Sequence, residues 1–196
     1  MKRNMIAGIL LIICCLTVNS ALAESIKGRF GITGKIGFLV PADSQDKPSG
    51  FDINTDTGFI GGGGFIYGFT DNIAAELDIT HANFGSDLNT DFDTTNISMG
   101  AQYRFLITAI KQLVPYAGAG LDILVNGADH GLDVDTVVGI HINGGVDYFL
   151  MKQLALTSEV KGVLAPNADI KESGFKVGEF DPSSFSMTFG VRYFFN

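Results

Sequence analysis

The sequence predicts an all-β protein, an eight-stranded antiparallel up-and-down transmembrane β-barrel. Residues 184–196 show the underlying pattern most clearly, because every second side chain is apolar. One face carries Phe185, Met187, Phe189, Val191, Tyr193 and Phe195, and the other carries Ser184, Ser186, Thr188, Gly190, Arg192 and Phe194. A strand turns successive side chains to opposite faces. A membrane barrel strand needs lipid-facing apolar residues on one face and lumen-facing polar residues on the other.

The end of this stretch recurs along the chain, which a single half-buried strand of a soluble sheet does not explain. Residues 64–69, 100–105 and 190–195 each read Gly-x-x-Tyr-x-Phe, and residues 145–149 are a looser copy. Each copy ends a run of alternating apolar residues. The intervals between copies are unequal, which indicates a repeated strand motif rather than a solenoid.

The other strands follow from the same alternation. We expect strands at residues 28–40, 57–69, 73–80, 97–105, 115–125, 138–148, 156–164 and 184–196. Tight turns are predicted at 70–72 and 151–153, a short helical turn within 106–114, and long polar loops at 41–55, 85–94, 126–133 and 165–183. The even strand number suits a bacterial outer-membrane barrel. The alternation of long and short connections places both termini and the short turns on the periplasmic side.

Aromatic residues gather at the two ends of the predicted strands. A periplasmic aromatic girdle is predicted from Tyr67, Phe69, Tyr103, Phe105, Tyr148, Tyr193 and Phe195. Phe38, Phe59, Phe84 and Phe185 fall beside the long loops and form the opposite band. Two such bands match the two membrane interfaces. A soluble lipocalin-like barrel is the alternative, and it would turn its apolar face inward.

The first residues form a targeting segment. Lys2 and Arg3 precede an apolar stretch at 5–16, and Ala21-Leu22-Ala23 matches a signal-peptidase site. We therefore expect a signal peptide at 1–23, cleaved near Ala23, and an outer-membrane barrel at 24–196. An uncleaved anchor is the alternative, although the apolar stretch is short for a membrane span.

The mature chain that this cleavage leaves has a distinctive composition. Both cysteines, Cys14 and Cys15, lie in the signal peptide, so disulfide and thiolate chemistry are not expected. The formal net charge of −8 becomes −10 when Lys2 and Arg3 are removed. This charge argues against nucleic acid as a partner. No cofactor is expected.

The inward faces of the predicted strands carry charges of both signs. Because successive side chains alternate between lipid and lumen, we expect the lumen to hold Arg29, Lys35, Glu76, Asp78, Arg104, Asp122, His141, Asp147, Glu159, Lys161 and Arg192. Side chains nearly fill the lumen of a small barrel, and buried charges must be paired. These residues form either a salt-bridged plug or a polar conduit, and the sequence does not give the register that would pair them.

Four stretches resemble the OmpW family of small outer-membrane barrels. Residues 41–44 (Pro-Ala-Asp-Ser) are similar to its exit from the first strand, and residues 70–77 (Thr-Asp-Asn-Ile-Ala-Ala-Glu-Leu) to its first periplasmic turn and third strand. Residues 115–121 (Pro-Tyr-Ala-Gly-Ala-Gly-Leu) resemble its fifth-strand entry, and residues 144–148 (Gly-Gly-Val-Asp-Tyr) the end of its sixth strand. The chain departs from the family in having no Trp and in ending with Asn196 after Phe195.

This resemblance implies a monomeric eight-stranded barrel in the bacterial outer membrane. It also implies passage of small apolar molecules through a narrow apolar interior with a lateral opening. We expect the barrel to contact membrane lipid and lipopolysaccharide. We also expect the barrel-insertion machinery to recognise the C-terminal strand. A closed structural or surface-interaction barrel is the alternative function.

The histidines and the acidic loops bear on two further functions. Catalysis is not expected: His81 falls on the lipid face, His130 in a loop, and His141 in the lumen with Asn143 rather than Ser nearby. The long loops are acidic, with Asp43, Asp46, Asp52, Asp87, Asp91, Asp93, Asp129, Asp133, Asp135, Asp169, Glu172, Glu179 and Asp181. Their spacing matches no EF-hand, so no metal site is predicted. A solvated face bridged by cations to lipopolysaccharide, or an adhesive surface, would suit them.

Overall fold

The computed structural model describes residues 25–42, 44–46, 51–53, 57–84, 92–107, 109–128, 133–172 and 175–195. The predicted signal peptide and its cleavage site lie outside these residues. No helix in the described part of the chain is long and apolar enough to cross a membrane.

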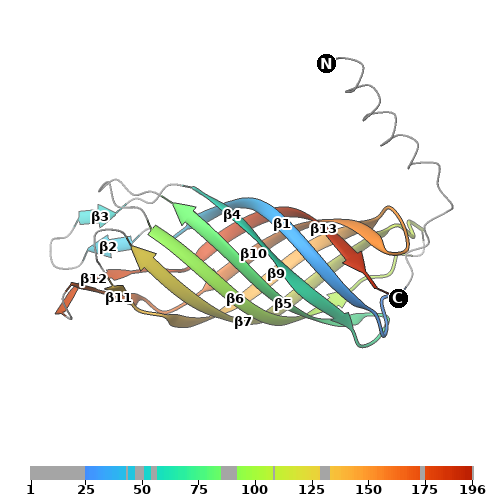
Figure 1. Ribbon diagram of the computed structural model, residues 1–196, viewed down its shortest axis with the longest axis horizontal. Helices are drawn as coiled ribbons and strands as arrows, with labels where there is room; N and C mark the ends of the chain where they lie inside the picture. The colour runs from blue at the N-terminus through green and yellow to red at the C-terminus, as the bar shows by residue number, and fades with distance from the viewer. Residues whose placement is uncertain are drawn as a thin grey trace, which may run out of the picture.

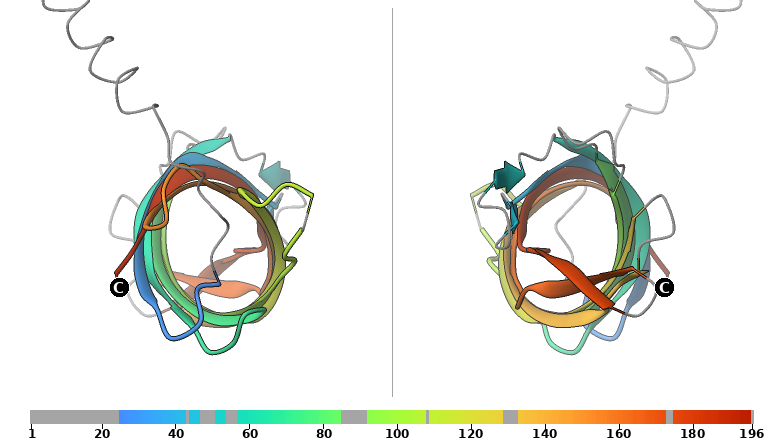
Figure 2. Two further views of the ribbon diagram at one scale, coloured as in Figure 1. Left: turned by 90° about the vertical axis from the view of Figure 1, so that its right-hand side faces the viewer. Right: turned by 90° about the vertical axis from the view of Figure 1, so that its left-hand side faces the viewer.

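Eight strands close into a barrel in which every pairing is antiparallel (Figures 1 and 2). They are β1 (Phe30–Pro41), β4 (Gly58–Gly68), β5 (Ile73–Phe84), β6 (Phe92–Arg104), β7 (Leu113–Ala128), β9 (Val137–Phe149), β10 (Leu154–Leu164) and β13 (Ser184–Phe194). Each strand pairs with the barrel strand before and after it in the chain, and β13 closes the ring on β1. The predicted eight-stranded up-and-down barrel is confirmed.

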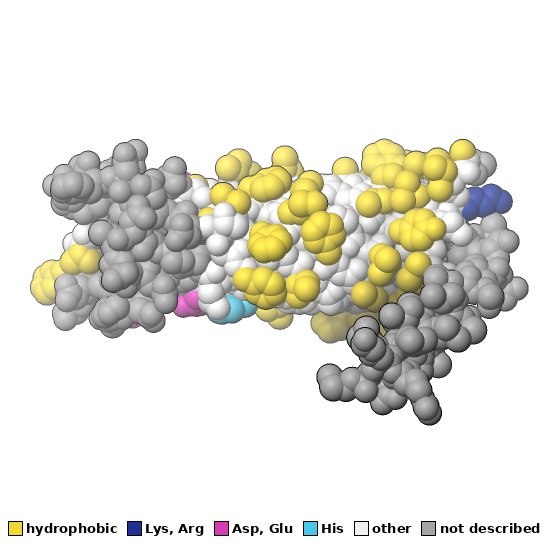
Figure 3. Space-filling model, turned by 90° about the horizontal axis from the view of Figure 1, so that it is seen from above, with side chains coloured by type: hydrophobic (Ala, Val, Ile, Leu, Met, Phe, Trp, Pro, Cys, Tyr) yellow, Lys and Arg dark blue, Asp and Glu magenta, His cyan; other side chains and the backbone are white. Residues whose placement is uncertain are grey.

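The wall turns its apolar residues outward. Burial in β1 alternates without a break from Phe30 to Pro41, with the apolar side chains of Ile36 and Phe38 each 59% exposed. The inward side chains of the same strand, Thr33 and Lys35, are buried. Figure 3 shows the apolar side chains spread over the outer wall in one view. A soluble lipocalin-like barrel has the reverse arrangement, so that alternative is wrong.

The barrel has two dissimilar ends. The turn end carries the short connections at 69–72, 105–112 and 150–153, together with Ile26 and the end of β13. The loop end carries the longer connections and five short strands: β2 (Ser44–Asp46), β3 (Phe51–Ile53), β8 (Asp133–Val134), β11 (Ala168–Glu172) and β12 (Phe175–Phe180). In the right-hand view of Figure 2, strands β11 and β12 cross the mouth of the barrel at the loop end.

Three predicted connections differ from the structure. The segment 41–55, expected as a loop, contains the short antiparallel pair β2–β3. The segment 165–183, also expected as a loop, contains the antiparallel hairpin β11–β12, which pairs with β8 through Ile170↔Val134 and Lys171↔Asp133. The described residues of 106–112 form turns rather than a helix, and β7 begins at Leu113, two residues before Pro115. Pro115 fits inside the strand because it lies near the strand end, opposite Val146 of β9.

The residues of the predicted periplasmic girdle all lie exposed near the turn end. Within the repeated motif, Tyr and Phe two positions apart lie on the same face and meet edge to face. The ring centroids of Tyr67–Phe69, Tyr103–Phe105 and Tyr193–Phe195 are 5.0, 5.1 and 5.1 Å apart. Edge-to-face packing suits the quadrupoles of two aromatic rings. The motif therefore builds the same aromatic pair at three strand ends.

Candidate functional site

The barrel interior is the candidate site, because it holds most of the buried charge of the described chain. The structure places nearly all of the predicted lumen residues there, and register joins them into three clusters. The exception is Arg29, which lies before β1 at the turn end. Its guanidinium donates to the carbonyl of Lys152 at 2.9 Å and stacks over the Phe194 ring. Arg29 thus ties the chain ends at the rim rather than lining the lumen.

The arginine cluster lies nearest the turn end and consists of Glu76, Gln102, Arg104, Asp147 and Arg192. Asp147 Oδ2 accepts from Arg104 at 2.6 Å and from Arg192 at 3.0 Å. Arg192 also donates to Glu76 Oε1 at 2.6 Å, and Gln102 donates to Glu76 Oε2 at 2.7 Å. Both arginines and Asp147 are fully buried. Such charges are tolerable in low dielectric only because each is paired.

The Lys35 cluster lies deeper along the axis and consists of Lys35, Asp78, Tyr116, Asn143 and Glu159. The Lys35 ammonium contacts Asp78 Oδ2 at 2.5 Å and Glu159 Oε1 at 3.2 Å. Glu159 Oε2 accepts from the Tyr116 hydroxyl and from the Asn143 amide. The ring of Tyr116 lies under both guanidinium groups of the arginine cluster, at 5.6 and 5.8 Å. Tyr116 therefore links the two clusters across the lumen.

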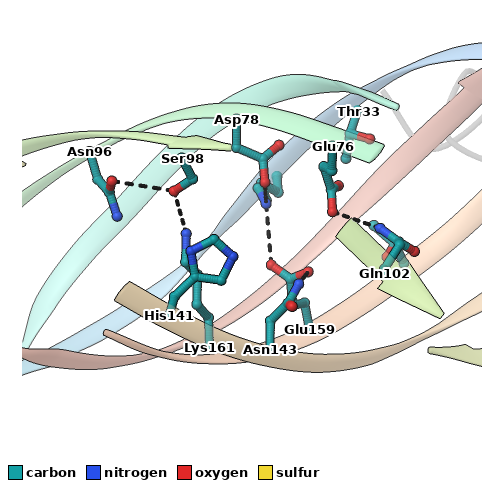
Figure 4. A network of polar contacts seen from close by, with 12 residues as sticks. Thr33, Glu76, Asp78, Asn96, Ser98, Gln102, His141, Asn143, Glu159 and Lys161 are labelled. Carbon is teal, nitrogen blue, oxygen red and sulfur yellow. Dashed lines mark hydrogen bonds and ion pairs between the residues drawn. The ribbon is translucent and has the colours of Figure 1, made fainter. Parts of the chain in front are cut away.

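The Asp122 cluster lies towards the loop end and consists of Asn96, Ser98, Asp122, His141 and Lys161. Figure 4 shows the four residues around Asp122. Asp122 Oδ1 accepts from Ser98 at 2.6 Å, from Asn96 at 2.9 Å and from Lys161 at 3.0 Å. Its other oxygen meets His141 Nδ1 at 2.6 Å, and Lys161 also donates to the Ser98 hydroxyl. Every oxygen of this buried carboxylate is thus occupied.

Apolar clusters close both ends of this polar interior. The turn-end cluster consists of Ile26, Ile66, Ala74, Val114, Phe149, Ala155 and Phe194, with the rings of Phe149 and Phe194 stacked 5.7 Å apart. The loop-end cluster consists of Leu39, Ile60, Ala82, Ala168, Ile170 and Phe180, with Val134 and Val137 against it. The interior is therefore layered along the axis as apolar, polar and apolar.

The described residues enclose small cavities within this interior, of which two are well defined. One, of about 10 Å³, is lined by residues that include Glu76, Asp78, His141 and Lys161. The other, of about 30 Å³, lies beneath the loop-end cluster, with Leu39 and Ile60 on its apolar side and Lys35 and Lys161 on its polar side. Volumes of this size hold single water molecules. Neither cavity makes a pore for a larger solute in this state.

Glycines make room for the polar side chains of the interior. The sequence has four of them in a row at Gly61–Gly64. A Cβ on Gly64 would overlap the carboxylate of Asp78 on the adjacent strand. A Cβ on Gly145 would meet the Tyr116 hydroxyl at 2.5 Å. The sequence signal for such a position is a glycine paired with an inward polar residue on the neighbouring strand. Recognising this signal requires the strand register, which the sequence does not give.

Sequence reasoning missed the uncharged members of the network. Thr33, Asn96, Ser98, Gln102, Tyr116 and Asn143 hydrogen-bond the charged side chains. All of them lie at inward positions of the strand alternation. The alternation would therefore have identified them if the predicted set of lumen residues had included neutral polar side chains as well as charged ones. Three buried acceptors have no hydrogen-bond partner in the described chain: Asp78 Oδ1, Asn143 Oδ1 and Asp147 Oδ1.

The histidines have different surroundings. His141 lies in the lumen, where Asp122 separates it from Ser98. A serine hydrolase instead places the imidazole between the serine and the carboxylate, so that the imidazole takes the proton from the hydroxyl. His81 lies on the outer wall against the hydroxyl of Thr95 at 3.0 Å, and His130 lies outside the described residues.

Several loop carboxylates belong to the hairpin rather than to a free acidic surface. Lys171 pairs with Asp135 at 2.7 Å, and Lys176 pairs with Asp169 at 2.6 Å and Glu179 at 2.9 Å. The hydrogen bonds to Asp135 raise the pKa of Lys171 above its ordinary value. Within the described residues, no group of three or more His, Cys, Asp or Glu is placed to hold a metal ion. The side chains of Asp43, Asp46, Asp52, Asp87, Asp91, Asp129 and Glu172 lie outside the described part.

Comparison with known proteins identifies the class of barrel. A family model described as an outer membrane protein β-barrel domain matches residues 8–192. The crystal structure of OprG from Pseudomonas aeruginosa is similar, with a TM-score of 0.71 at 19% identity, covering 89% of this chain and 99% of that one. Neisserial surface protein A (NspA) gives a TM-score of 0.65 at 19% identity, covering 85% and 97%.

The outer membrane protein AlkL, solved in lipid bilayers, gives a TM-score of 0.61 at 17% identity, covering 92% of this chain and 96% of that one. No curated protein matches the chain in sequence. At these identities the similarity shows the fold. That fold is a small outer-membrane barrel, in agreement with the family match over residues 8–192.

Proposed function

Because the chain belongs to the family of outer-membrane protein β-barrel domains, we propose that it is a passive entry site for small apolar molecules. Solutes enter at the loop end, which faces the cell exterior, and leave sideways into the membrane. The signal peptide at 1–23 directs the chain to the outer membrane, where the barrel works as a monomer and not as an enzyme.

The observation that carries this proposal is the loop-end apolar cluster above a closed polar layer. Leu39, Ile60 and Ala82 turn inward from three neighbouring strands, against the rule that the lumen face of a membrane barrel is polar. An apolar solute gains free energy by leaving water for such a surface. The paired charges below oppose its further movement along the axis, because an apolar solute offers them no hydrogen bonds.

The register of β1 supports a lateral exit. On one side β1 pairs with β13 as far as Pro41↔Ser184. On the other side the described ladder to β4 ends at Leu39↔Gly58, so Val40 and Pro41 have no β4 partner there. Proline also has no N–H to donate to a neighbouring strand. This edge of the wall is next to Leu39. We infer that it forms the lateral opening, for which the family resemblance implies no particular place.

A closed structural or surface-interaction barrel is the second candidate, and a specific observation favours it. Between the ion-paired clusters and the apolar clusters at both ends, the two cavities of the described interior measure about 10 and 30 Å³, the size of water molecules. In that case the lumen serves stability, and the loops carry whatever surface role the protein has. Contact with lipid and lipopolysaccharide is common to both candidates.

Purified barrel in vesicles with a lipopolysaccharide outer leaflet separates the candidates. N-phenyl-1-naphthylamine fluoresces when it reaches the bilayer, and sugar-driven swelling reports a water-filled pore. Faster probe entry without swelling supports the apolar entry site. Swelling as well would mean an ordinary pore. Neither effect, from a barrel whose folding is shown by heat-modifiable migration in gels, would leave the closed barrel as the function.

A further inference from the structure

The loop-end apolar cluster has two parts of different origin. Leu39, Ile60 and Ala82 belong to barrel strands β1, β4 and β5, and Ile60 lies directly opposite Ala82 in the ladder. Ala168, Ile170 and Phe180 belong to the hairpin β11–β12, which is outside the closed barrel sheet. The wall therefore supplies an apolar surface, and a separate element covers it.

The covering side chains are deeply seated. Ala168 is fully buried, and Phe180 and Ile170 are 2% and 8% exposed. The cavity of about 30 Å³ lies directly beneath, bounded by Leu39, Ile60, Ala82, Leu124 and Val163 above and by polar residues such as Lys35 and Lys161 below. The hairpin side chains pack on Leu39, Ile60 and Ala82, which also line this cavity. Lifting Ile170 and Phe180 would therefore leave an apolar hollow over these three side chains, with the small cavity and its polar residues on their other side.

The hairpin is attached more loosely than the barrel strands. Among the described residues its ladder to β8 has two residue pairs, Ile170↔Val134 and Lys171↔Asp133, with one further backbone hydrogen bond from Asp135 to the carbonyl of Asp169 at 3.1 Å. At its base, Ser183 exchanges hydrogen bonds with the backbone of Ala165 at 3.2 and 3.3 Å. Its ion pairs are solvent-exposed, as with Lys171 and Asp135, and exposed pairs contribute little to stability. The hairpin can lift without opening any ladder of the barrel.

We propose that Ile170 and Phe180 occupy a binding site for a small uncharged apolar molecule, and that the hairpin β11–β12 vacates it on binding. The hairpin is an internal competitor for the site. This inference rests on the proposed function and names the site at which it begins. The polar residues of the small cavity select against long chains that would have to reach past Lys35 and Glu159. The site thus fits a compact hydrocarbon or a small aromatic molecule.

A reversible disulfide tests this directly, because the chain after residue 23 contains no cysteine. Lys171 and Asp133 are Cα partners in an antiparallel ladder, a spacing compatible with a disulfide. Lys171→Cys with Asp133→Cys, when oxidised, holds the hairpin down without touching the apolar side chains. Lys171→Cys alone is the control for loss of the Lys171–Asp135 ion pair, and Asp133→Cys alone is the control for loss of the Asp133 carboxylate.

The readout is photolabelling by the apolar probe 3-(trifluoromethyl)-3-phenyldiazirine in lipid vesicles, mapped by mass spectrometry. Labelling of Leu39, Ile60 and Ala82 reports the site, and labelling of the lipid-facing Phe38 and Phe59 reports probe in the bilayer. We expect the reduced barrel to be labelled at both places. Oxidation should abolish labelling of the inward residues and leave the lipid-facing residues unchanged.

Phe180→Ser provides a second variant, which should raise inward labelling above that of the unaltered barrel. Inward labelling that survives oxidation would overturn the hairpin's role and leave the proposed apolar entry site standing. An absence of inward labelling in both the reduced barrel and Phe180→Ser would overturn the site itself. If probe entry into lipopolysaccharide vesicles still occurred, the proposed function would stand by another route.

Discussion

Position 64 requires glycine because of the neighbouring carboxylate, and not because of its backbone conformation. It pairs with Asp78 of β5, and a Cβ would come within 2.9 Å of Asp78 Cγ and 2.5 Å of the Leu77 carbonyl oxygen. Asp78 in turn holds Lys35 at 2.5 Å. A methyl group at this position therefore acts on the Lys35 cluster through the displaced carboxylate.

Gly64→Ala should lower the free energy of unfolding by about 1–3 kcal/mol, the usual cost of overpacking. Gly34→Ala is the matched control, because a Cβ there meets nothing within 4 Å. Urea titration of the barrel in vesicles, followed by heat-modifiable gel migration, gives both midpoints. Equal midpoints for the two variants would show that Asp78 can move away without cost.

Asp147 is the residue on which the arginine cluster depends. It is fully buried and accepts from both Arg104 and Arg192. Asp147→Asn should lower the free energy of unfolding by about 3–5 kcal/mol, because it leaves buried guanidinium groups without their shared anion. Lys171→Met removes an exposed pair and should change the same urea midpoint little. A small effect of Asp147→Asn would indicate that water reaches the cluster.

Single residues also show where sequence reasoning stops. Alternation alone predicted that Glu76 and Arg192 point inward, because parity needs no knowledge of pairing. It could not predict that they meet at 2.6 Å across 116 positions of sequence, because that contact depends on register and barrel closure. Gly118 likewise reads as an inward position that would accept Ser. In the structure its Cβ would lie 2.5 Å from Asn143 Oδ1 and 2.7 Å from the Ala101 carbonyl oxygen.

Strand β7 shows how far the alternation of a single element determines its environment. Ala119 lies near the middle of the strand, on the outer face, between Ala101 of β6 and Ile142 of β9. Ala119→Arg should cost about 2–4 kcal/mol in a bilayer, as for a lipid-facing arginine near the midplane. Ala119→Leu keeps the bulk without the charge and should fold as well as the unaltered barrel in the same titration. Equal tolerance of Arg and Leu would contradict the assigned face.

The hairpin β11–β12 contains the longest of the strands that sequence reasoning failed to find. Its strands are short and lie between Pro166 and Pro182, and proline usually marks loops. Lys171, Lys176 and Glu179 make the segment look polar, yet they pair with neighbours while Ile170 and Phe180 fill the mouth. A short hairpin half buried in a barrel mouth has no long apolar face for the alternation to reveal.

Across the whole molecule, the layering of the interior decides what can pass. The sequence indicated a charged lumen, and it placed Phe194 on the polar face without explaining it. The structure accounts for Phe194 by its stack on Phe149 in the turn-end cluster. Apolar clusters at both ends exclude water from the charges between them, which strengthens each ion pair. The same arrangement makes the polar layers, rather than the hairpin, the barrier to ions.

Deleting the hairpin while keeping the three charged clusters tests which of them is the barrier to ions. Deleting residues 168–180 takes away β11 and β12 and exposes Leu39, Ile60 and Ala82, but the arginine, Lys35 and Asp122 clusters belong to barrel strands and stay paired. We expect the shortened barrel to fold, to admit apolar probe faster, and to show no stable ion conductance in planar bilayers. The unaltered barrel should also be silent. Steady conductance after the deletion would mean that the hairpin seals the lumen and that the paired charges lie along a conducting path.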